Sequence, residues 1–287
     1  MFESPDYVLG LITASDRVLD VGGWAEVFPR ANVVLDANPY STRKIVHRDM
    51  PECFAEDTWF SGDICTAATW RRFRDKEFDF SICSHTLEDV RDPIFVSSQL
   101  IRVSRAGYIE VPSAFRETCK ASSTDISAGY DHHRWIVDVD DAGRLVFTAK
   151  LSWANDFDPG GDRARAVLSD PRFGFLSVTW RESFSFYERM PKGSILETEN
   201  LFHLYDTFNY GEPPAYRRVL AKSTETAPTF VWADDYLLPI EKLHSHEYLI
   251  NQYERRRQAE IRGQTQRIAL KTRTKLARLK TALGMKR

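Results

Sequence analysis

Residues 17–40 read RVLDVGGWAEVFPRANVVLDANPY, and this stretch decides the fold. Its first run, Val18–Val21, is largely apolar and β-branched, which is typical of a buried parallel strand. The run stops at Gly22 and Gly23, where a chain without Cβ atoms turns sharply and lets a ligand approach the backbone. A second apolar run follows over residues 33–35. The stretch therefore predicts two parallel strands joined by a glycine turn and a crossover.

The second run ends in an acid, Asp36. In an open α/β sheet, nucleotide-like ligands bind at the carboxyl edge, where an acid accepts hydrogen bonds from a ribose diol. A dinucleotide site requires G-x-G-x-x-G at the start of a helix, so that backbone N–H groups meet a pyrophosphate. Here Trp24 follows the glycine pair, and neither that motif nor the phosphate-binding G-x-x-x-x-G-K-[ST] occurs in the sequence. We therefore expect a ligand with a ribose and no phosphate.

At these residues the chain resembles the class I S-adenosylmethionine-dependent methyltransferases. Their first motif, an acid followed by a glycine-rich turn, matches Asp20–Gly23, and the acid that closes their second strand matches Asp36. The family usually has a third small residue in the turn, where this chain has Trp24. The resemblance implies S-adenosyl-L-methionine as the cofactor. The residues expected to bind it are Asp20, Gly22, Gly23, Asp36, Asp63 and Ser84.

Later segments match the same family in the same order. Asp63 corresponds to the family's acid after strand three, which accepts from the adenine amino group. Residues 77–85 resemble its fourth strand, and they precede Leu87-Glu88-Asp89-Val90, where the family usually has histidine at the third position. Residues 106–112 resemble the fifth strand. The blocks predict a Rossmann-like, doubly wound, mostly parallel seven-stranded α/β sheet. Helices are expected over residues 6–13, 66–74 and 94–102.

The resemblance weakens after about residue 113. We interpret residues 113–173 as a large insertion after strand five that covers the substrate pocket, because such sheets bind ligands above their carboxyl ends. The segment Asp140-Asp141-Ala142-Gly143 predicts a hairpin turn within it. The strands expected in and after the insertion cover residues 134–139 and 144–150, which flank that turn, and residues 176–180 and 183–187, which close the main sheet in antiparallel fashion.

Methyl transfer to an alcohol requires a base near neutral pH, and histidine is the usual choice. His85 lies where strand four should end, although it also fits a polar residue that caps the following helix. His132 and His133 follow Asp131, and a base oriented by an acid suits the deprotonation of a hydroxyl. Their alternative interpretation is two surface histidines in a hairpin. In a strand, adjacent residues point to opposite faces, so only one of the pair would enter the pocket.

A metal is not expected from the sequence. His85, Glu88 and Asp89 have the spacing of an acid-x-x-Glu-His cluster that holds a divalent metal in some ubiquinone-pathway O-methyltransferases, but both end residues differ. Glu88 also suits the start of a helix, where an acid interacts favourably with the helix dipole.

The acceptor is expected to be a sugar hydroxyl of a glycan or of a glycosylated small molecule. Residues 132–135, His-His-Arg-Trp, loosely resemble a segment of methyltransferases from polysaccharide and O-antigen gene clusters, which implies polysaccharide biosynthesis. Tyr130, Trp135 and Trp153 would suit the apolar faces of a pyranose, although aromatic residues are equally ordinary core material.

Composition favours a cytoplasmic globular protein. The chain has 287 residues, of which 43% are hydrophobic, so it can build a substantial core. No apolar run approaches the roughly 20 residues that span a bilayer, and the first ten residues lack the features of a signal peptide. The cysteines are dispersed without a C-x-x-C pair, which fits a reducing compartment. They are Cys53, Cys65, Cys83 and Cys119.

The C-terminal region has a different character from the rest of the chain. We expect a methyltransferase domain over residues 1–240 and a basic amphipathic helical tail over residues 241–287. Residues 254–287 contain twelve Lys/Arg and two Glu, which leaves the preceding residues near −12 and disfavours nucleic acid as a partner. Such a helix suits peripheral contact with the inner membrane face or pairing with a sister subunit. The alternative function is therefore a non-catalytic methyltransferase-like module recruited to a membrane or partner by this tail.

Overall fold

The computed structural model divides into two compact units, Met1–Ala233 and Asp234–Arg287. The expected tail helix over residues 241–287, and the boundary expected at residue 240, lie outside the described residues. The described residues all belong to the first unit, and they are residues 5–45, 52–120, 122, 125–140, 142–150, 155, 165–166, 168–169, 173–190, 217–221 and 229–232.

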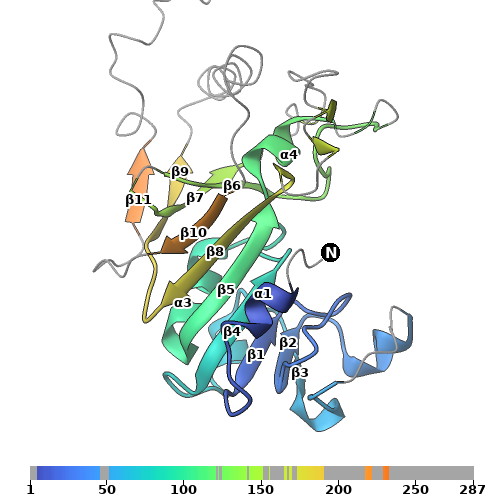
Figure 1. Ribbon diagram of the computed structural model, residues 1–287, viewed down its shortest axis with the longest axis vertical. Helices are drawn as coiled ribbons and strands as arrows, with labels where there is room; N and C mark the ends of the chain where they lie inside the picture. Colours follow the sequence, from blue (N-terminus) through green and yellow to red (C-terminus); the bar gives the residue numbers. More distant parts are fainter. Residues whose placement is uncertain are drawn as a thin grey trace, which may run out of the picture. The chain divides into compact units, whose positions relative to one another are not determined.

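The main sheet has the strand order β10-β8-β5-β4-β1-β2-β3 (Figure 1). Its first five strands along the chain run parallel to one another, β8 runs antiparallel to β5, and β10 runs parallel to β8. This mixed α/β sheet fits the Rossmann-like class expected from the sequence. The strands are β1 (Val18–Val21), β2 (Val33–Asp36), β3 (Trp59–Ser61), β4 (Phe78–Ser84), β5 (Ser104–Pro112), β8 (Phe175–Arg181) and β10 (Arg217–Ala221).

The register of β1 and β2 places their carboxyl ends side by side. Val21 pairs with Leu35, and all four residues of each strand are buried, as expected for central parallel strands. The ladder continues one residue beyond β1, because the Gly22 N–H donates to the Leu35 carbonyl oxygen at 2.8 Å. The glycine turn and Asp36 therefore lie at the same edge of the sheet.

Helices cover the sheet less completely than a doubly wound fold requires. The 11-residue helix α3 (Pro93–Val103) matches the expected segment, and its N-cap Asp92 accepts a hydrogen bond from the Phe95 N–H at 2.8 Å. The expected helices over residues 6–13 and 66–74 are shorter, as α1 (Pro5–Leu9) and α2 (Ala67–Trp70). The crossover from β1 to β2 is irregular chain without a helix.

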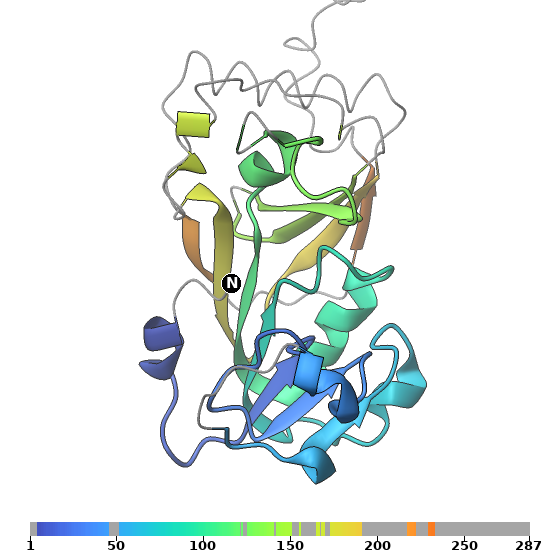
Figure 2. The same ribbon diagram turned by 90° about the vertical axis from the view of Figure 1, so that its right-hand side faces the viewer.

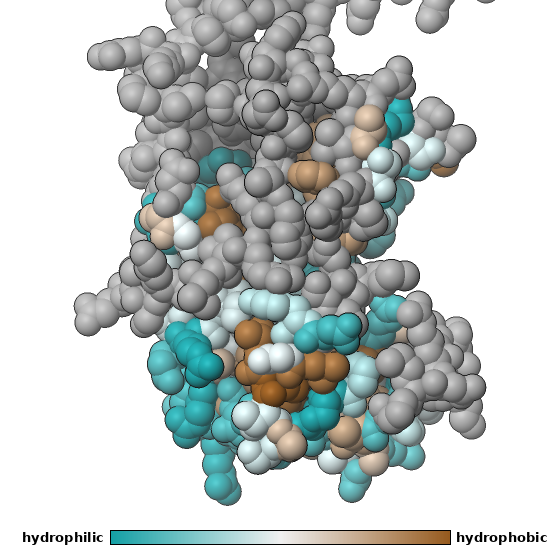
Figure 3. All heavy atoms as spheres, in the orientation of Figure 1, coloured by the Kyte–Doolittle hydropathy of each residue, from teal (hydrophilic) through white to brown (hydrophobic). Residues whose placement is uncertain are grey.

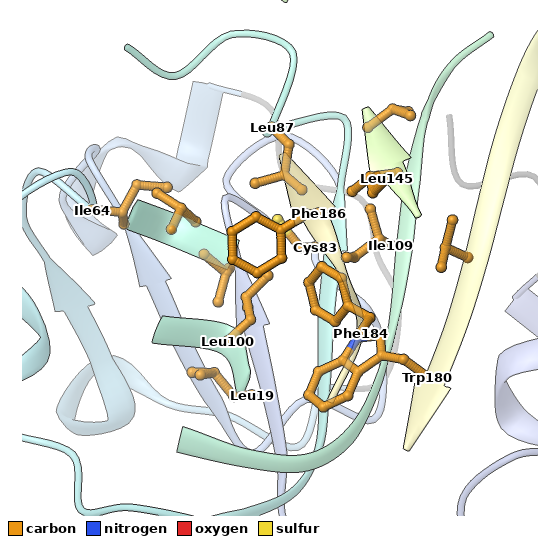
Figure 4. Close-up of a cluster of buried hydrophobic side chains, with 14 of the residues drawn as sticks. Leu19, Ile64, Cys83, Leu87, Leu100, Ile109, Leu145, Trp180, Phe184 and Phe186 are labelled. Carbon is orange, nitrogen blue, oxygen red and sulfur yellow. The ribbon is translucent and has the colours of Figure 1, made fainter. Parts of the chain in front are cut away.

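The hydrophobic core therefore has two parts, one on each face of the sheet, and they differ in the elements that cover them. On one face of the sheet, α3 and α2 pack with strand residues such as Leu19 and Ile109, and Figure 4 shows this cluster with Leu100 and Trp180. On the other face, α1 and the irregular crossover supply the cover, through Val8 and Phe28. Figure 3 shows an apolar patch, framed by hydrophilic side chains, over the part of the sheet that carries α1.

A second sheet, of order β11-β9-β7-β6, completes the unit. The predicted hairpin is confirmed: β6 and β7 pair antiparallel across a turn in which the Asp140 carboxylate accepts from the N–H groups of Ala142 and Arg144. The short helix α4 (Ala114–Thr118) follows β5, and Figure 2 shows α4 at the end of β5 with the hairpin beside the last part of that strand. The strands are β6 (Trp135–Val139), β7 (Leu145–Ala149), β9 (Phe186–Met190) and β11 (Thr229–Trp232).

One strand prediction was wrong. Residues 176–180 lie in β8, antiparallel to β5, as expected. Residues 183–187 do not close the main sheet, because the chain turns sharply at Glu182, whose φ is +60°, and β9 then pairs parallel with β7. The insertion is thus part of a second sheet with later strands, and its residues Val137 and Phe147 share a core with the main sheet.

Among the described residues, no helix is long and apolar enough to cross a membrane.

The packing of α3 predicts a large effect of truncating Leu100, which is fully buried. Leu100→Ala should lower the free energy of unfolding by about 2–5 kcal/mol, because it removes apolar contacts and leaves a cavity. Ile126, 95% exposed, is the control, and Ile126→Ala should change stability by less than about 0.5 kcal/mol. Urea denaturation measures both. Equal losses would contradict the assignment of Leu100 to the core.

Candidate active site

The turn after β1 requires glycine for two separate reasons. Gly22 has φ +80°, in the left-handed region that favours glycine, and a Cβ there would overlap Thr86 Oγ1. A Cβ on Gly23 would lie 2.5 Å from Asp20 Oδ2. The turn therefore packs directly on the side chains of Asp20 and Thr86, and its glycines are explained by this packing whether or not a ligand approaches them.

Two buried acids flank the turn. The Asp20 carboxylate accepts a hydrogen bond from the Phe28 N–H at 2.7 Å. Burial raises the pKa of Asp20 to about 7 against the lowering effect of that bond, and the negative charge of Asp36 adds to the rise. Asp36 accepts from the N–H groups of Trp24 at 3.1 Å and Asn38 at 2.7 Å, while burial raises its pKa above the usual value.

Asp63 lies in the loop after β3 and is exposed. Its carboxylate accepts from the Cys65 N–H at 2.8 Å, and its other oxygen accepts from the Arg91 guanidinium at 2.7 Å. The Cys65 hydrogen bond and the Arg91 guanidinium lower the pKa of Asp63. An adenine amino group at Asp63 would have to share the carboxylate with Arg91.

His85 follows the last residue of β4 and holds φ +48°. Its Nδ1 lies 3.3 Å from Glu88 Oε1, and its Nε2 lies 3.4 Å from Glu110 Oε1. Burial lowers the pKa of His85, but the carboxylates of Glu110 and Glu88 outweigh it and raise the pKa to about 9. His85 therefore keeps its proton at neutral pH in this structure, which does not suit a general base.

Glu110 is the central acid of this first cluster. It is fully buried on β5, accepts from Tyr108 Oη at 2.6 Å, and accepts from Ser84 Oγ at 3.3 Å. Sequence reasoning assigned Ser84 to the cofactor and did not single out Glu110. The available signal was an acid inside the otherwise apolar run of strand five, because a buried carboxylate requires donors nearby.

A second cluster forms around Glu117 on α4. Glu117 Oε1 lies 2.8 Å from His133 Nδ1, and its Oε2 lies 2.8 Å from Lys150 Nζ. The side chains of Glu117, Lys150 and His133 are 0%, 1% and 7% exposed, so all three charged or polar groups are out of water. Burial raises the pKa of Glu117, but His133 and Lys150 outweigh it and bring the pKa below its usual value.

Backbone contacts fix the loop that carries His132 and His133. Gly129, with φ +60°, allows the loop to pass over Glu117, since a Cβ there would lie 2.5 Å from the Glu117 carbonyl oxygen. Lys150 Nζ donates to the Tyr130 carbonyl oxygen at 2.7 Å. The Arg134 N–H donates to the Glu88 carbonyl oxygen at 2.8 Å, which ties this loop to the segment after β4.

The structure changes the partner of the predicted histidine pair. The acid that orients His133 is Glu117, whereas Asp131 is exposed and lies 3.6 Å from His132 Nδ1. The segment is a turn and not a strand, so the centroids of the two histidine rings lie only 4.5 Å apart. Their exposure differs, because the His132 side chain is 64% exposed and that of His133 is nearly buried. Sequence reasoning missed Glu117 because nothing in its local sequence distinguishes it.

Asp89 joins the histidine pair from the segment after β4. Its Oδ1 lies 3.8 Å from His133 Nε2, on the other side of the ring from Glu117. The structure thus brings His132 and His133 to Asp89, whereas the sequence had grouped Asp89 with His85 and Glu88.

Comparisons with known proteins give structural neighbours only. No protein-family model matches the sequence, and no curated protein matches it. The chain is similar to an S-adenosylmethionine-dependent methyltransferase from Archaeoglobus fulgidus (16% identity over 40% of this chain and 52% of that one, TM-score 0.31). It is similar to another from Mesorhizobium loti (14% identity, 51% of this chain and 64% of that one, TM-score 0.29) and to the YcgJ protein from Bacillus subtilis (17%, 39% and 52%, TM-score 0.30). The matches span about half to two thirds of those chains.

The His85 cluster predicts a specific pH dependence of stability. The pKa of His85 is about 9 in the folded protein against a usual 6.5, so its contribution to stability is complete below about pH 6.5 and is lost as pH rises through about 9. The thermal midpoint should fall across this window in the wild type, measured by circular dichroism. In His85→Gln, this fall should be absent while stability near neutral pH is lower. An unchanged pH profile in the variant would refute the assigned charge state.

Proposed function

We propose that the chain is an S-adenosyl-L-methionine-dependent methyltransferase that transfers a methyl group to a hydroxyl, with a sugar hydroxyl as the acceptor. The observation that carries the proposal is the pair of buried acids, Asp20 and Asp36, beside the glycine turn at the carboxyl edge of β1 and β2. In open α/β sheets this edge is the ligand-binding edge.

The charges at this edge suit that cofactor. Asp20 and Asp36 are buried near one another, and a phosphate beside them would meet strong repulsion. A nucleoside with a sulfonium and an ammonium group brings positive charge and ribose hydroxyl donors. Glu88 adds a buried carboxylate, whose Oε1 lies 3.3 Å from His85 Nδ1 and whose Oε2 makes no hydrogen bond among the described residues. One carboxylate oxygen of Glu88 therefore remains as a spare acceptor.

We assign the cofactor-binding roles as follows. Asp36 accepts from the ribose hydroxyls, and Asp63 accepts from the adenine amino group in competition with Arg91. Asp20, the turn at Gly22 and Gly23, and Ser84 surround the amino-acid portion. When bound, the cofactor supplies an activated methyl group, so the protein's contribution is alignment and removal of the acceptor's proton.

The proton-accepting role falls to the histidine pair. His85 is held as a cation between Glu88 and Glu110, so it acts as a fixed positive charge at the end of β4. His133 donates from Nδ1 to Glu117, which leaves Nε2 as the acceptor nitrogen. This is the arrangement of a base oriented by a buried carboxylate. His132, with Asp131 beside it, lies on the exposed side of the pair.

The aromatic residues expected to bind a sugar ring have different positions. Tyr130 is 38% exposed, and its ring packs between other side chains: its centroid lies 4.7 Å from that of His133, and the Arg116 guanidinium lies 4.8 Å over it. Trp135 donates from Nε1 to the Val90 carbonyl oxygen at 2.7 Å and packs against Phe147, which is a structural role. Trp153 lies outside the described residues.

The alternative function is a non-catalytic methyltransferase-like module recruited to a membrane or partner through its basic tail. It is favoured by the packing of Gly22 and Gly23 on Thr86 and Asp20, which explains both glycines without a ligand. Cofactor binding separates the two functions.

Calorimetry with S-adenosylhomocysteine tests the proposal. The wild type should bind it, and Asp36→Asn should bind about 10- to 100-fold more weakly, because it removes charged hydrogen bonds to the ribose. Asp57→Asn, on the exposed 3₁₀ turn Glu56–Thr58, is the matched control and should bind like the wild type. If the wild type fails to bind at millimolar ligand, or if both variants weaken equally, the proposal fails.

A further inference from the structure

We propose that Asp89, His132 and His133 form a binding site for one divalent transition-metal ion of the Zn²⁺ type. One ligand atom from each residue, a carboxylate oxygen or an imidazole nitrogen, lies within 4.8 Å of the other two. The residues come from the segment after β4 and from the loop before β6, so the fold and not the local sequence brings them together.

The spacing is close to that of a bound ion. Zinc–nitrogen bonds are roughly 2.0–2.1 Å long, which puts tetrahedral donor atoms about 3.4 Å apart. Asp89 Oδ1 and His133 Nε2 are already 3.8 Å apart. The His132 side chain is 64% exposed, so it can rotate toward the other two ligands without disturbing the core.

The surroundings of His133 match those of a metal ligand. Histidines that bind metals almost always donate their second ring N–H to a carboxylate or carbonyl, which fixes the tautomer. His133 Nδ1 lies 2.8 Å from the fully buried Glu117 carboxylate, and a carboxylate only accepts. In the neutral imidazole that donates from Nδ1, the lone pair lies on Nε2, on the side of Asp89. Lys150 Nζ lies 2.8 Å from the other Glu117 oxygen. The opposite charges of Lys150 and Glu117 balance, so the buried lysine does not prevent a cation from binding at His133.

The two halves of the site are tied together before any ion binds. The Glu88 carbonyl oxygen, one residue before Asp89, accepts from the N–H groups of both Arg134 and Trp135. These residues directly follow His133 along the chain. A site held by such cross-links loses little conformational entropy on binding, which favours affinity.

The donor set selects the class of ion. Two imidazoles and one carboxylate suit Zn²⁺ and related first-row ions, whereas Mg²⁺ and Ca²⁺ prefer oxygen ligands throughout. Three protein ligands also leave one tetrahedral position open, as in catalytic zinc sites and unlike closed structural ones.

The consequence for chemistry rests on the proposed function. An acceptor hydroxyl at the open position would have its pKa lowered by the ion, and its proton would pass to water. The oxygen would then form a bond to the methyl carbon as the carbon–sulfur bond breaks, with the electron pair staying on sulfur as S-adenosylhomocysteine. With the ion bound, His132 and His133 would serve as its ligands, and the ion would activate the hydroxyl in place of a free imidazole.

Calorimetric titration of the full chain with Zn²⁺, in the absence of cofactor, tests the site. We expect one equivalent to bind with a dissociation constant at or below about 1 μM and Mg²⁺ to bind at least about 100-fold more weakly. His132→Asn, at an exposed position, and Asp89→Asn should each remove this equivalent. Glu117→Gln should weaken it about 10- to 100-fold, because it disturbs the hydrogen bond that orients His133.

Asp57→Asn is again the control, since Asp57 is an exposed acid on the 3₁₀ turn Glu56–Thr58 and is not among the three ligands. It should keep the wild-type affinity. Thermal midpoints without metal show whether Glu117→Gln still folds, and His132→Asn decides the outcome if it does not. Zinc binding that is absent in the wild type, or unchanged in His132→Asn, would overturn the site. A wild type that binds zinc but not S-adenosylhomocysteine would overturn the proposed function and leave the site intact.

Discussion

The parallel register of β1 with β2 and β4 is the constraint on which the rest of the structure depends. Val21 pairs with Leu35, and Asp20 pairs with both Val34 and Ile82, so three strands end together. A shift of one residue would move every side chain of a strand to the opposite face and would exchange the side chains that pack in the two cores. The strand register therefore brings the glycine turn and the acids Asp20 and Asp36 to one edge of the sheet.

Burial of charge is the second organising feature. Glu110 and Glu117 are fully buried, and the fold gives each a cation: His85 for Glu110, and Lys150 for Glu117. An uncompensated buried carboxylate is costly, so these pairs restrict how the segment after β4 and the loop before β6 can be placed. The carboxylates of Glu110 and Glu88 also raise the pKa of His85, and the Glu117 carboxylate orients the imidazole of His133. Electrostatics thus couples the stability of the site to its chemistry.

Several elements could be predicted because their signals are local. The central strands are apolar runs bounded by glycines or acids, and the hairpin before residue 150 has a glycine-bearing turn between alternating segments. The assignment of residues 183–187 failed because an alternating pattern predicts a strand and does not identify its partner. Asp131 looked like the acid for the histidine pair because it is adjacent in sequence, but Glu117, 16 residues away from His133, fills that position.

The sequence by itself determined the apolar runs that form the central strands, the glycine turn and the acids beside it, since these follow from residue types within a few positions of one another. Only the tertiary structure decided which histidine is buried, which carboxylate orients it, and that Asp89 faces the pair. Those contacts join α4, the end of β7 and the segment after β4. Contacts between distant segments depend on how whole elements pack, and one sequence carries no local pattern for that.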